Sequence, residues 1–313
     1  MSAPLALFVG AHLACYGFPD GHPLGIDRQG AFWSEALALG LDKRVQVFAP
    51  RLATRQELER FHTTEHVSWV KLRSEVGDGY LDYGDTPAFP GVFERGAAVA
   101  GTAIEGLERL MAGDVRRTFQ PIGGLHHARR GQAAGFCVFN DLGVVIESLR
   151  ARFGVARVGY ADIDVHHGDG IYYPYEADPA LIVVDIHEDG RFLYPGTGHA
   201  REIGRGEAEG TKLNLPLPPR AGDREFFAAW EKGLAHLRRY KPEFLILQCG
   251  ADGLAGDPLG DLSYTPAVHA RVARDVRRLA DEMCGGRLMA FGGGGYDLKN
   301  LAAAWTAALG ELA

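Results

Sequence analysis

The sequence predicts a single-domain α/β fold, in which a doubly wound, mainly parallel sheet of eight strands carries helices on both faces. Short apolar runs alternate with longer helical patterns, which is typical of right-handed βαβ crossovers. Several runs are continuously apolar, as strands buried on both faces of a parallel sheet are. Because no repeat, low-complexity tract or linker interrupts the 313 residues, we expect one domain over residues 1–313.

The expected strands are eight apolar runs bounded by turn residues. They lie at 5–9, 45–49, 118–122, 158–163, 181–186, 213–217, 244–248 and 287–291. Helical patterns lie between them at 91–111, 141–152, 223–239, 266–283 and 298–309, and Arg28 opens a further helix. In open α/β sheets, ligands bind beyond the carboxyl ends of the strands, where the loops emerge. The loops that follow these strands are therefore the candidate functional segments.

Composition excludes several classes of protein. The formal net charge of −7 argues against a general nucleic-acid binder. No apolar run reaches the roughly twenty residues of a transmembrane helix, so we expect no membrane partner. The four cysteines show no C-x-x-C spacing, which argues against a disulfide framework or a zinc ribbon and favours the cytoplasm.

The densest polar stretch follows the expected strand at 158–163. Three Asp and two His fall within residues 162–169. Side chains alternate along a strand, so Asp162, Asp164 and His166 are expected on one face. Such a face is costly to bury unless a divalent metal compensates it, and these donors suit a borderline metal. The alternative is an acidic loop with unrelated histidines.

A third candidate ligand, Asp252, follows the strand at 244–248. Alone, this residue could equally cap a turn. Joined to Asp164 and His166, it makes two carboxylates and one imidazole, which leave coordination positions open. Open positions indicate a catalytic rather than a structural metal site.

Two further loops carry candidate catalytic groups. His126 and His127 follow the strand at 118–122, and one of them could act as a general base if a carboxylate held its tautomer. The alternatives are that this pair binds a metal or that it lies on the surface without a function. Four glycines precede Tyr296. The alternative is a dinucleotide-binding loop, but it would require a further strand after the helix at 298–309, and residues 310–313 are too few to form one. We therefore expect the glycines to present the Tyr296 hydroxyl to developing negative charge.

Together these motifs resemble the histone deacetylase superfamily, including its acetoin-utilisation and acetylpolyamine amidohydrolase branches, and look closest to the class I-like pattern. The resemblance covers nearly the whole chain and implies an arginase/deacetylase-like fold. Its carriers are HPLGIDR (22–28), GDTPAFPGVFE (84–94), GGLHHA (123–128), GFCVFND (135–141), DIDVHHGDG (162–170), YPGTG (194–198), LQCGAD (247–252), GDPLG (256–260) and GGGGY (292–296).

The resemblance also implies roles for individual residues. The family's zinc ligands fall on Asp164, His166 and Asp252, and its transition-state tyrosine falls on Tyr296. Its paired histidines fall on His126 and His127, with Asp162 and Asp169 as their respective carboxylate partners. The other implied positions are the channel walls Phe136 and Tyr194, the rim residue Asp85, the internal-cavity residue Arg28, and an inner potassium site of Asp162, Asp164, the His166 carbonyl, Asp185 and Ile186.

Three departures from the family pattern are visible. A hydroxyl residue commonly stands where this chain has Asp185, which bears on the potassium site. The loop at 187–195 is slightly longer than in class I relatives, which bears on Tyr194 and the channel shape. His199 stands where an Asp commonly follows the PGTG motif.

The implied reaction is metal-dependent hydrolysis of an N-acetylated amine with release of acetate, using Zn²⁺ (or Fe²⁺ in the cell) and a structural K⁺. We expect acetyl-lysine in proteins or peptides as the substrate, because residues 87–121 leave little chain for a lid over the channel mouth. The alternatives are a deacetylase of acetylpolyamines or other small acyl amines, an arginase-like binuclear hydrolase, and a catalytically inactive binding module.

Overall fold

The computed structural model describes residues 5–19 and 21–313. Within these residues, eight strands form one sheet in the order β2-β1-β3-β8-β7-β4-β5-β6. Every neighbouring pair is parallel, so the expected, mainly parallel sheet is confirmed and is parallel throughout. The strands are β1 (Leu5–Phe8), β2 (Val45–Phe48), β3 (Arg117–Gln120), β4 (Val158–Asp162), β5 (Leu181–Glu188), β6 (Lys212–Leu217), β7 (Phe244–Gln248) and β8 (Leu288–Phe291).

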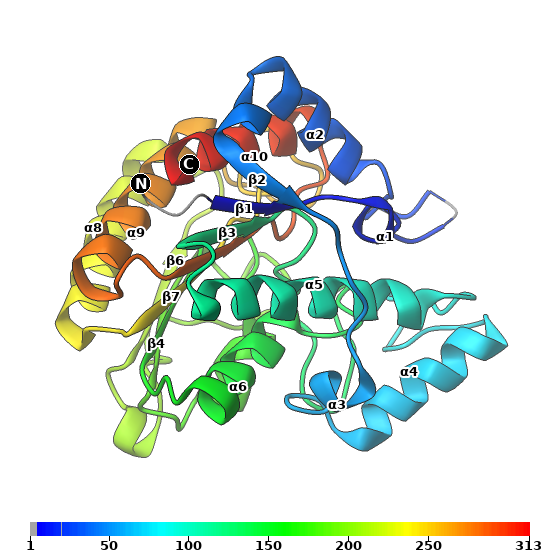
Figure 1. The fold of residues 1–313 in the computed structure, drawn as a ribbon. Helices are drawn as coiled ribbons and strands as arrows, with labels where there is room; N and C mark the ends of the chain where they lie inside the picture. The colour runs from blue at the N-terminus through cyan, green and yellow to red at the C-terminus, as the bar shows by residue number, and fades with distance from the viewer. Residues whose placement is uncertain (1–4, 20) are drawn as a thin grey trace.

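Helices cover both faces of this sheet (Figure 1). Helices α2 and α10, drawn above the sheet, and α8 and α9, drawn to its left, cover one face, and α10 packs against α9 and α2. Helices α5 and α6 pack together on the opposite face, and α4 lies outside α5. The longer helices are α2 (Arg28–Ala38), α4 (Thr64–Val76), α5 (Val92–Ala112), α6 (Asp141–Phe153), α8 (Asp223–Tyr240), α9 (Pro266–Met283) and α10 (Leu298–Leu312). Single turns of helix occur at α1 (Ala11–Ala14), α3 (Arg55–Leu58) and α7 (Asp169–Tyr172), with 3₁₀ turns at η1 (Leu41–Arg44), η2 (Tyr173–Tyr175) and η3 (Gly206–Ala208).

Helix α4 is the long helix that the sequence pattern did not predict. It begins after Thr63, whose side chain accepts a hydrogen bond from the third residue of the helix, and it ends at Gly77 in the left-handed conformation. Its side chains explain why no amphipathic pattern is visible. Val70 is buried, while Trp69 and Leu72 on the other side of the helix are exposed. Apolar residues on both sides of a helix cancel the periodicity on which prediction depends.

Sheet order determines where the polar loops meet. The four adjacent strands β3, β8, β7 and β4 all point the same way, so the loops that follow them emerge at one edge. These loops are residues 121–140, 292–297, 249–265 and 163–168. Every residue of β4, β7 and β8 is buried, which makes the strand ends a fixed support for the loops.

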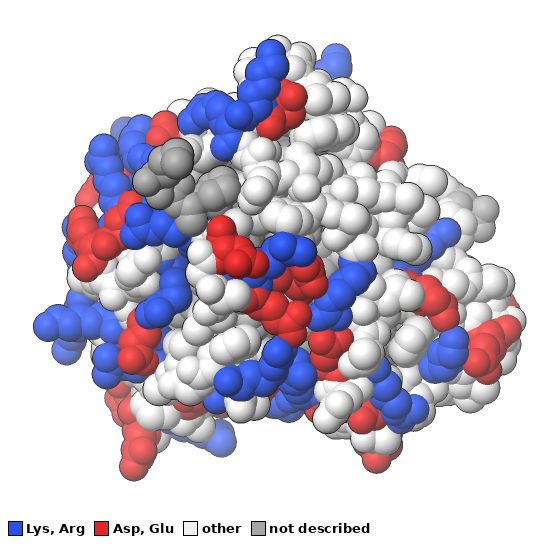
Figure 2. Space-filling view, viewed as in Figure 1, with Lys and Arg blue, Asp and Glu red and all other residues white. Residues whose placement is uncertain are grey.

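The surface carries charges of both signs. Positive and negative side chains are mixed over the face shown in Figure 2, and many form ion pairs such as Arg152 with Glu108 and Arg51 with Glu105. Among residues 5–19 and 21–313, no helix has the length and apolar character needed to cross a membrane.

Candidate metal centre and active-site pocket

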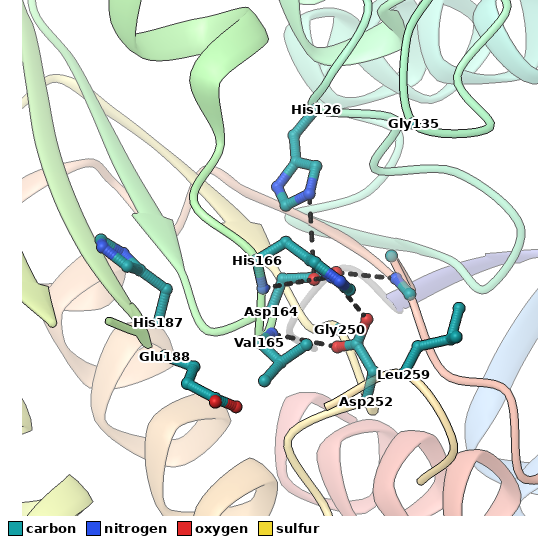
Figure 3. A network of polar contacts seen from close by, with 12 residues as sticks. His126, Gly135, Asp164, Val165, His166, His187, Glu188, Gly250, Asp252 and Leu259 are labelled. Carbon is teal, nitrogen blue, oxygen red and sulfur yellow. Dashed lines mark hydrogen bonds and ion pairs between the residues drawn. The ribbon is translucent and has the colours of Figure 1, made fainter. Parts of the chain in front are cut away.

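Two aspartates and one histidine converge at the carboxyl edge of the sheet. Asp164 and His166 lie in the loop after β4, and Asp252 lies in the loop after β7. All three are buried, and one ligand atom from each lies within 4.8 Å of the others. The His166 Nδ1 atom is 3.1 Å from Asp164 Oδ1 and 3.2 Å from Asp252 Oδ2. Figure 3 shows these side chains pointing toward one another, with His126 above them.

The donors of this group fit a divalent metal ion. Asp252 Oδ1 accepts a hydrogen bond from the Val165 N–H, but Asp252 Oδ2 is buried without a hydrogen-bond donor. Burial opposes protonation of His166, yet the adjacent carboxylates of Asp164 and Asp252 raise the pKa of His166 to about 10. Both observations indicate uncompensated negative charge, and buried negative charge with oxygen and nitrogen donors is what a borderline metal neutralises.

His126 and His127 are each hydrogen-bonded to their own aspartate. His126 Nδ1 lies 2.7 Å from Asp162 Oδ2, and His127 Nδ1 lies 2.7 Å from Asp169 Oδ1. The two Nε2 atoms face each other at 3.2 Å. Arg129, which the sequence pattern did not single out, donates to the other oxygen of Asp169 at 2.8 Å.

The surroundings of the two histidines give them different pKa values. Burial opposes protonation of His126, but the carboxylates of Asp162 and Asp164 raise its pKa to about 10. Burial and the positive charge of His126 lower the pKa of His127 to about 4. At neutral pH, His126 is therefore the charged member of the pair and His127 is the neutral one. Burial acts against ionisation of Asp169, yet hydrogen bonds from His127 and Arg129 lower its pKa to about 2.

The start of helix α6 holds the loop that carries the two histidines. Asp141 accepts hydrogen bonds from the backbone N–H groups of Gly124 at 2.9 Å and Leu125 at 2.8 Å. The neighbouring Asn140 caps α6 and donates to the Ala128 carbonyl at 2.8 Å. These two side chains therefore fix the backbone on both sides of the histidine pair.

Tyr296 enters the pocket from the loop between β8 and α10. Its backbone N–H donates to Asp257 Oδ2 at 2.7 Å. Arg28 donates to the carbonyls of Gly295 at 2.9 Å and Gly293 at 2.5 Å, so this buried side chain fastens the glycine loop from behind. Burial and the nearby carboxylates raise the pKa of Tyr296 well above its usual value, so its phenol keeps the proton it would donate.

A channel leads from the surface to these groups. A cavity of about 250 Å³ is lined by apolar walls together with His127, His166 and Tyr296. An inner pocket of about 20 Å³, also reached by these three side chains, extends to His126 and Asp164. The residues that form the wall and rim of the channel are Asp85, Phe136, Leu193, Tyr194 and Leu259.

The channel wall includes both residues expected from the sequence and two that were missed. Tyr194 is 44% exposed, and its ring centre lies 5.1 Å from that of His127. The Phe136 ring centre lies 6.0 Å from that of Tyr296. Leu193 and Leu259 were missed, and their one sequence signal is position, since they adjoin or fall within the YPGTG and GDPLG motifs.

The expected rim residue Asp85 is exposed at the channel mouth. Its carboxyl group is nevertheless partly shielded from water, and this desolvation and the neighbouring Asp82 raise the pKa of Asp85 to about 7. A second pocket of about 260 Å³ adjoins the mouth and shares Asp85 and Tyr194 with the channel. The rim is thus open to a group larger than one extended side chain.

Two of the residues implied for a potassium ion, Asp162 and Asp185, lie close to each other. Asp162 and Asp185 both approach Gly168, because a Cβ atom added there would meet their Oδ2 atoms at 2.8 and 3.3 Å. Asp185 Oδ1 lies 2.6 Å from His187 Nδ1, and Asp185 Oδ2 accepts from the Gly168 N–H at 2.9 Å. Hydrogen bonds therefore already occupy both oxygens of Asp185, and the potassium site stays a prediction.

Comparison with known proteins gives matches over almost all of the chain. The family model described as "Histone deacetylase domain" matches residues 22–312. Acetoin utilization protein AcuC of Bacillus subtilis is 35% identical over 291 residues, which cover 90% of this chain and 75% of that protein. Histone deacetylase 8 of Xenopus tropicalis is 34% identical over 277 residues, or 86% of this chain and 73% of that protein. The crystal structure of the HDA15 HD domain superposes with a TM-score of 0.91 at 29% identity, covering 99% of this chain and 88% of that one.

Proposed function

The chain belongs to the histone deacetylase family, and from this premise we propose that it is a zinc-dependent deacetylase acting on acetyl-lysine in peptides or proteins. One observation carries the proposal. A buried group of two carboxylates and one imidazole, suited to a metal, lies at the floor of an apolar channel beside two aspartate-paired histidines.

In this proposal Asp164, His166 and Asp252 hold the metal, with Zn²⁺ as the expected ion and Fe²⁺ as the alternative in the cell. Three protein ligands leave positions open for a reacting group. When bound there, the ion supplies Lewis acidity that polarises the acetyl carbonyl and acidifies the attacking water. Strong chelation should therefore abolish turnover.

His127 is the proposed general base. Its Nδ1–H donates to Asp169, which fixes the tautomer and leaves Nε2 as the unprotonated ring nitrogen of a side chain that lines the channel. Because His127 is the neutral member of the pair, Nε2 can take the proton of the attacking water and return it to the leaving amine. His126 is the charged member, held by Asp162, and acts mainly through its electrostatic field.

The Tyr296 hydroxyl is proposed to donate a hydrogen bond to the oxyanion that develops on the acetyl carbonyl. Its raised pKa suits this role, since a donor must keep its proton through the reaction. Removing one donor of this kind typically costs roughly 10²–10³ in kcat.

The channel supports an acetyl-lysine substrate. Phe136, Leu193, Tyr194 and Leu259 offer apolar walls to the four methylene groups of a lysine side chain. At the mouth, the Asp85 carboxylate could accept backbone N–H bonds on either side of the acetyl-lysine, and charge-assisted bonds are the stronger kind. The open rim leaves room for the rest of a polypeptide.

The metal site can be tested through its ligands. Asp164→Ala, His166→Ala and Asp252→Ala should each lose both bound metal and turnover, because each removes one of three ligands. Metal content after dialysis and hydrolysis of an acetyl-lysine reporter are the two measurements. Full metal content in one variant would remove that residue from the ligand set, and a fully loaded wild type without turnover would support an inactive binding module.

The substrate class can be tested with metal-defined enzyme at pH 8, where the carboxylate form of Asp85 prevails. We expect acetyl-lysine peptides to be cleaved, with Asp85→Asn lowering kcat/KM more for peptides than for a small acetyl-lysine amide. Equal effects on both would show that Asp85 is only a solvated turn residue. Acetylpolyamines cleaved far faster than every peptide would replace the peptide substrate by small amines.

A further inference from the structure

We propose that Gln248 is a positioning residue, which couples the metal ligand Asp164 to the loop that carries His126 and His127. Gln248 is the last residue of β7 and is fully buried. The inference rests on the proposed function, because it takes Asp164 as a metal ligand. It goes further by assigning metal affinity to a side chain that does not itself reach the metal.

The amide of Gln248 contacts three of the loops that build the pocket. Its Nε2 donates to Asp164 Oδ2 at 2.7 Å and to the Gly124 carbonyl at 3.3 Å. Its Oε1 accepts from the Gly250 N–H at 2.7 Å. The Nε2 atom faces two acceptors and the Oε1 atom faces a donor, which fixes the orientation of the amide. Of the side chains of this size, a neutral amide is the one that satisfies all three partners.

The contact with Asp164 determines how that carboxylate faces the pocket. Asp164 Oδ2 also accepts from the Gly294 N–H at 2.8 Å, so two donors hold this oxygen. The other oxygen, Oδ1, is then turned toward His166 Nδ1, 3.1 Å away. Without Gln248, only the backbone N–H groups of Gly294, at Oδ2, and of His166, at Oδ1, would resist rotation of the carboxylate. Loss of such an outer hydrogen bond typically costs about 10–100-fold in metal affinity.

The contact with Gly124 extends the coupling to the catalytic histidines. The N–H of Gly124 is held by Asp141 at 2.9 Å, and its carbonyl is held by Gln248. Gly124 has a φ of 79°, a conformation that glycine adopts without strain, and a Cβ atom here would lie 3.1 Å from Gln248 Cγ. A shift of Gln248 therefore moves the backbone two residues before His126.

Three substitutions separate the effect of Gln248 on Asp164 from the effect of disturbing the loop that carries the two histidines. Gln248→Met keeps the length of the side chain and removes all three hydrogen bonds. Gln248→Glu keeps an acceptor for Gly250 and places an oxygen against Asp164 Oδ2. Asp141→Asn disturbs the same loop but touches none of the three proposed metal ligands.

A matched control exists in β3, which is separated from β7 by β8. Gln120, the last residue of β3, is also buried and donates to the carbonyls of Val99 at 3.0 Å and Ile122 at 2.8 Å. Gln120→Met therefore measures the general effect of replacing a buried glutamine at a strand end, without a contact to a proposed ligand.

The readouts are the Co²⁺ and Zn²⁺ dissociation constants, measured by competition with a chromophoric chelator, and the visible absorption of the Co²⁺ protein. We expect both Gln248 variants to raise the Kd by about 10–100-fold and to alter the Co²⁺ spectrum. Asp141→Asn should lower kcat at an unchanged Kd, and Gln120→Met should keep the wild-type Kd.

Wild-type metal affinity in Gln248→Met, or an equal loss in Gln120→Met, overturns the inference while leaving the proposed function intact. Failure of the wild-type chain to bind either metal would instead overturn the proposed function. Circular dichroism checks folding first. If Gln248→Met is unfolded, Gln248→Asn replaces it, because it keeps the amide but is one methylene too short to reach Asp164, and the same outcomes apply.

Discussion

At the scale of single residues, the pocket separates two neighbouring histidines by their surroundings. His126 lies against Asp162 and within 3.8 Å of Asp164, so carboxylates stabilise its positive charge. His127 has one carboxylate, Asp169, whose charge is already shared with Arg129. Positive charge on two adjacent imidazoles is unfavourable because the charges repel each other, so His127 is the neutral member of the pair.

This difference predicts unequal effects of two substitutions. We expect His127→Ala to retain its metal and lose about 10²–10⁴ in kcat, the usual contribution of a general acid–base group. His126→Ala should lose less, because it removes a charge near the reaction and not the base. Metal content and kcat of both variants decide the point. Equal or reversed losses would contradict the assignment of roles, though not the class of enzyme.

Phe136 shows how a channel wall can require strain. Its φ of 66° lies in the left-handed region, which costs roughly 1–2 kcal/mol for a residue with a side chain. Two contacts hold it there. The Tyr16 hydroxyl donates to the Phe136 carbonyl at 2.8 Å, and the Phe136 N–H donates to Thr86 Oγ1 at 3.1 Å. The ring is thereby aimed at the channel.

At the scale of elements, the pocket is built from loops that follow four adjacent parallel strands. One close approach between them is at Gly294, in the loop after β8. A Cβ atom added at Gly294 would overlap Asp252 Oδ2 and lie 2.9 Å from Asp164 Oδ2. The backbone of one loop therefore packs directly against two proposed metal ligands from two other loops.

Gly294→Ala should accordingly lose bound metal and turnover, because the two carboxylates cannot keep their positions. Gly30→Ala is the matched control. It lies within helix α2, and nothing lies within 4 Å of an added Cβ atom there. We expect that control to keep its metal and to gain about 0.4–1 kcal/mol in free energy of unfolding. Full metal content in Gly294→Ala would show that the loop can move aside.

Some of these elements and side chains could be predicted from the sequence, and others could not. Strand β7 was predicted with its bounds because a continuous apolar run has one interpretation in a parallel sheet. The polar residues at such strand ends, among them Asp252, could be predicted to meet for the same reason. Leu259 could not, since an isolated leucine in a loop carries no pattern until the loop is folded. Gln248 was also missed, because its role lies in three hydrogen bonds between distant segments.

At the scale of the whole molecule, several histidines are buried outside the proposed ligand set. His62, His66, His167 and His269 are all buried, and burial lowers the pKa of each. The α4 residue His66 illustrates the environment. Its Nε2 lies 3.0 Å from the Val138 carbonyl, and its pKa is lowered to about 4.

These buried histidines predict a loss of stability in mild acid. Below pH 6.5 the unfolded chain takes up protons on its histidines, while the folded chain keeps His66 neutral until about pH 4. At these histidines the unfolded state then binds more protons, so their contribution to the free energy of unfolding falls as the pH falls from 6.5 to 4. Each such group contributes a slope of up to about 1.4 kcal/mol per pH unit within that window. The contribution is fully present above pH 6.5.

Removing one of these histidines should therefore flatten the pH dependence. We expect His66→Gln to lower the slope between pH 6.5 and 4 by up to about 1.4 kcal/mol per pH unit, whatever its effect on stability at pH 7. Urea unfolding of metal-free protein, followed by the fluorescence of the buried Trp230 and Trp305, measures the slope. Metal-free protein is needed because metal affinity falls as the proposed ligands are protonated, and this would add its own pH dependence. His12→Gln, at an exposed histidine, is the control for losing an imidazole. Parallel curves for His66→Gln and the wild type would mean that His66 is not kept neutral by the fold.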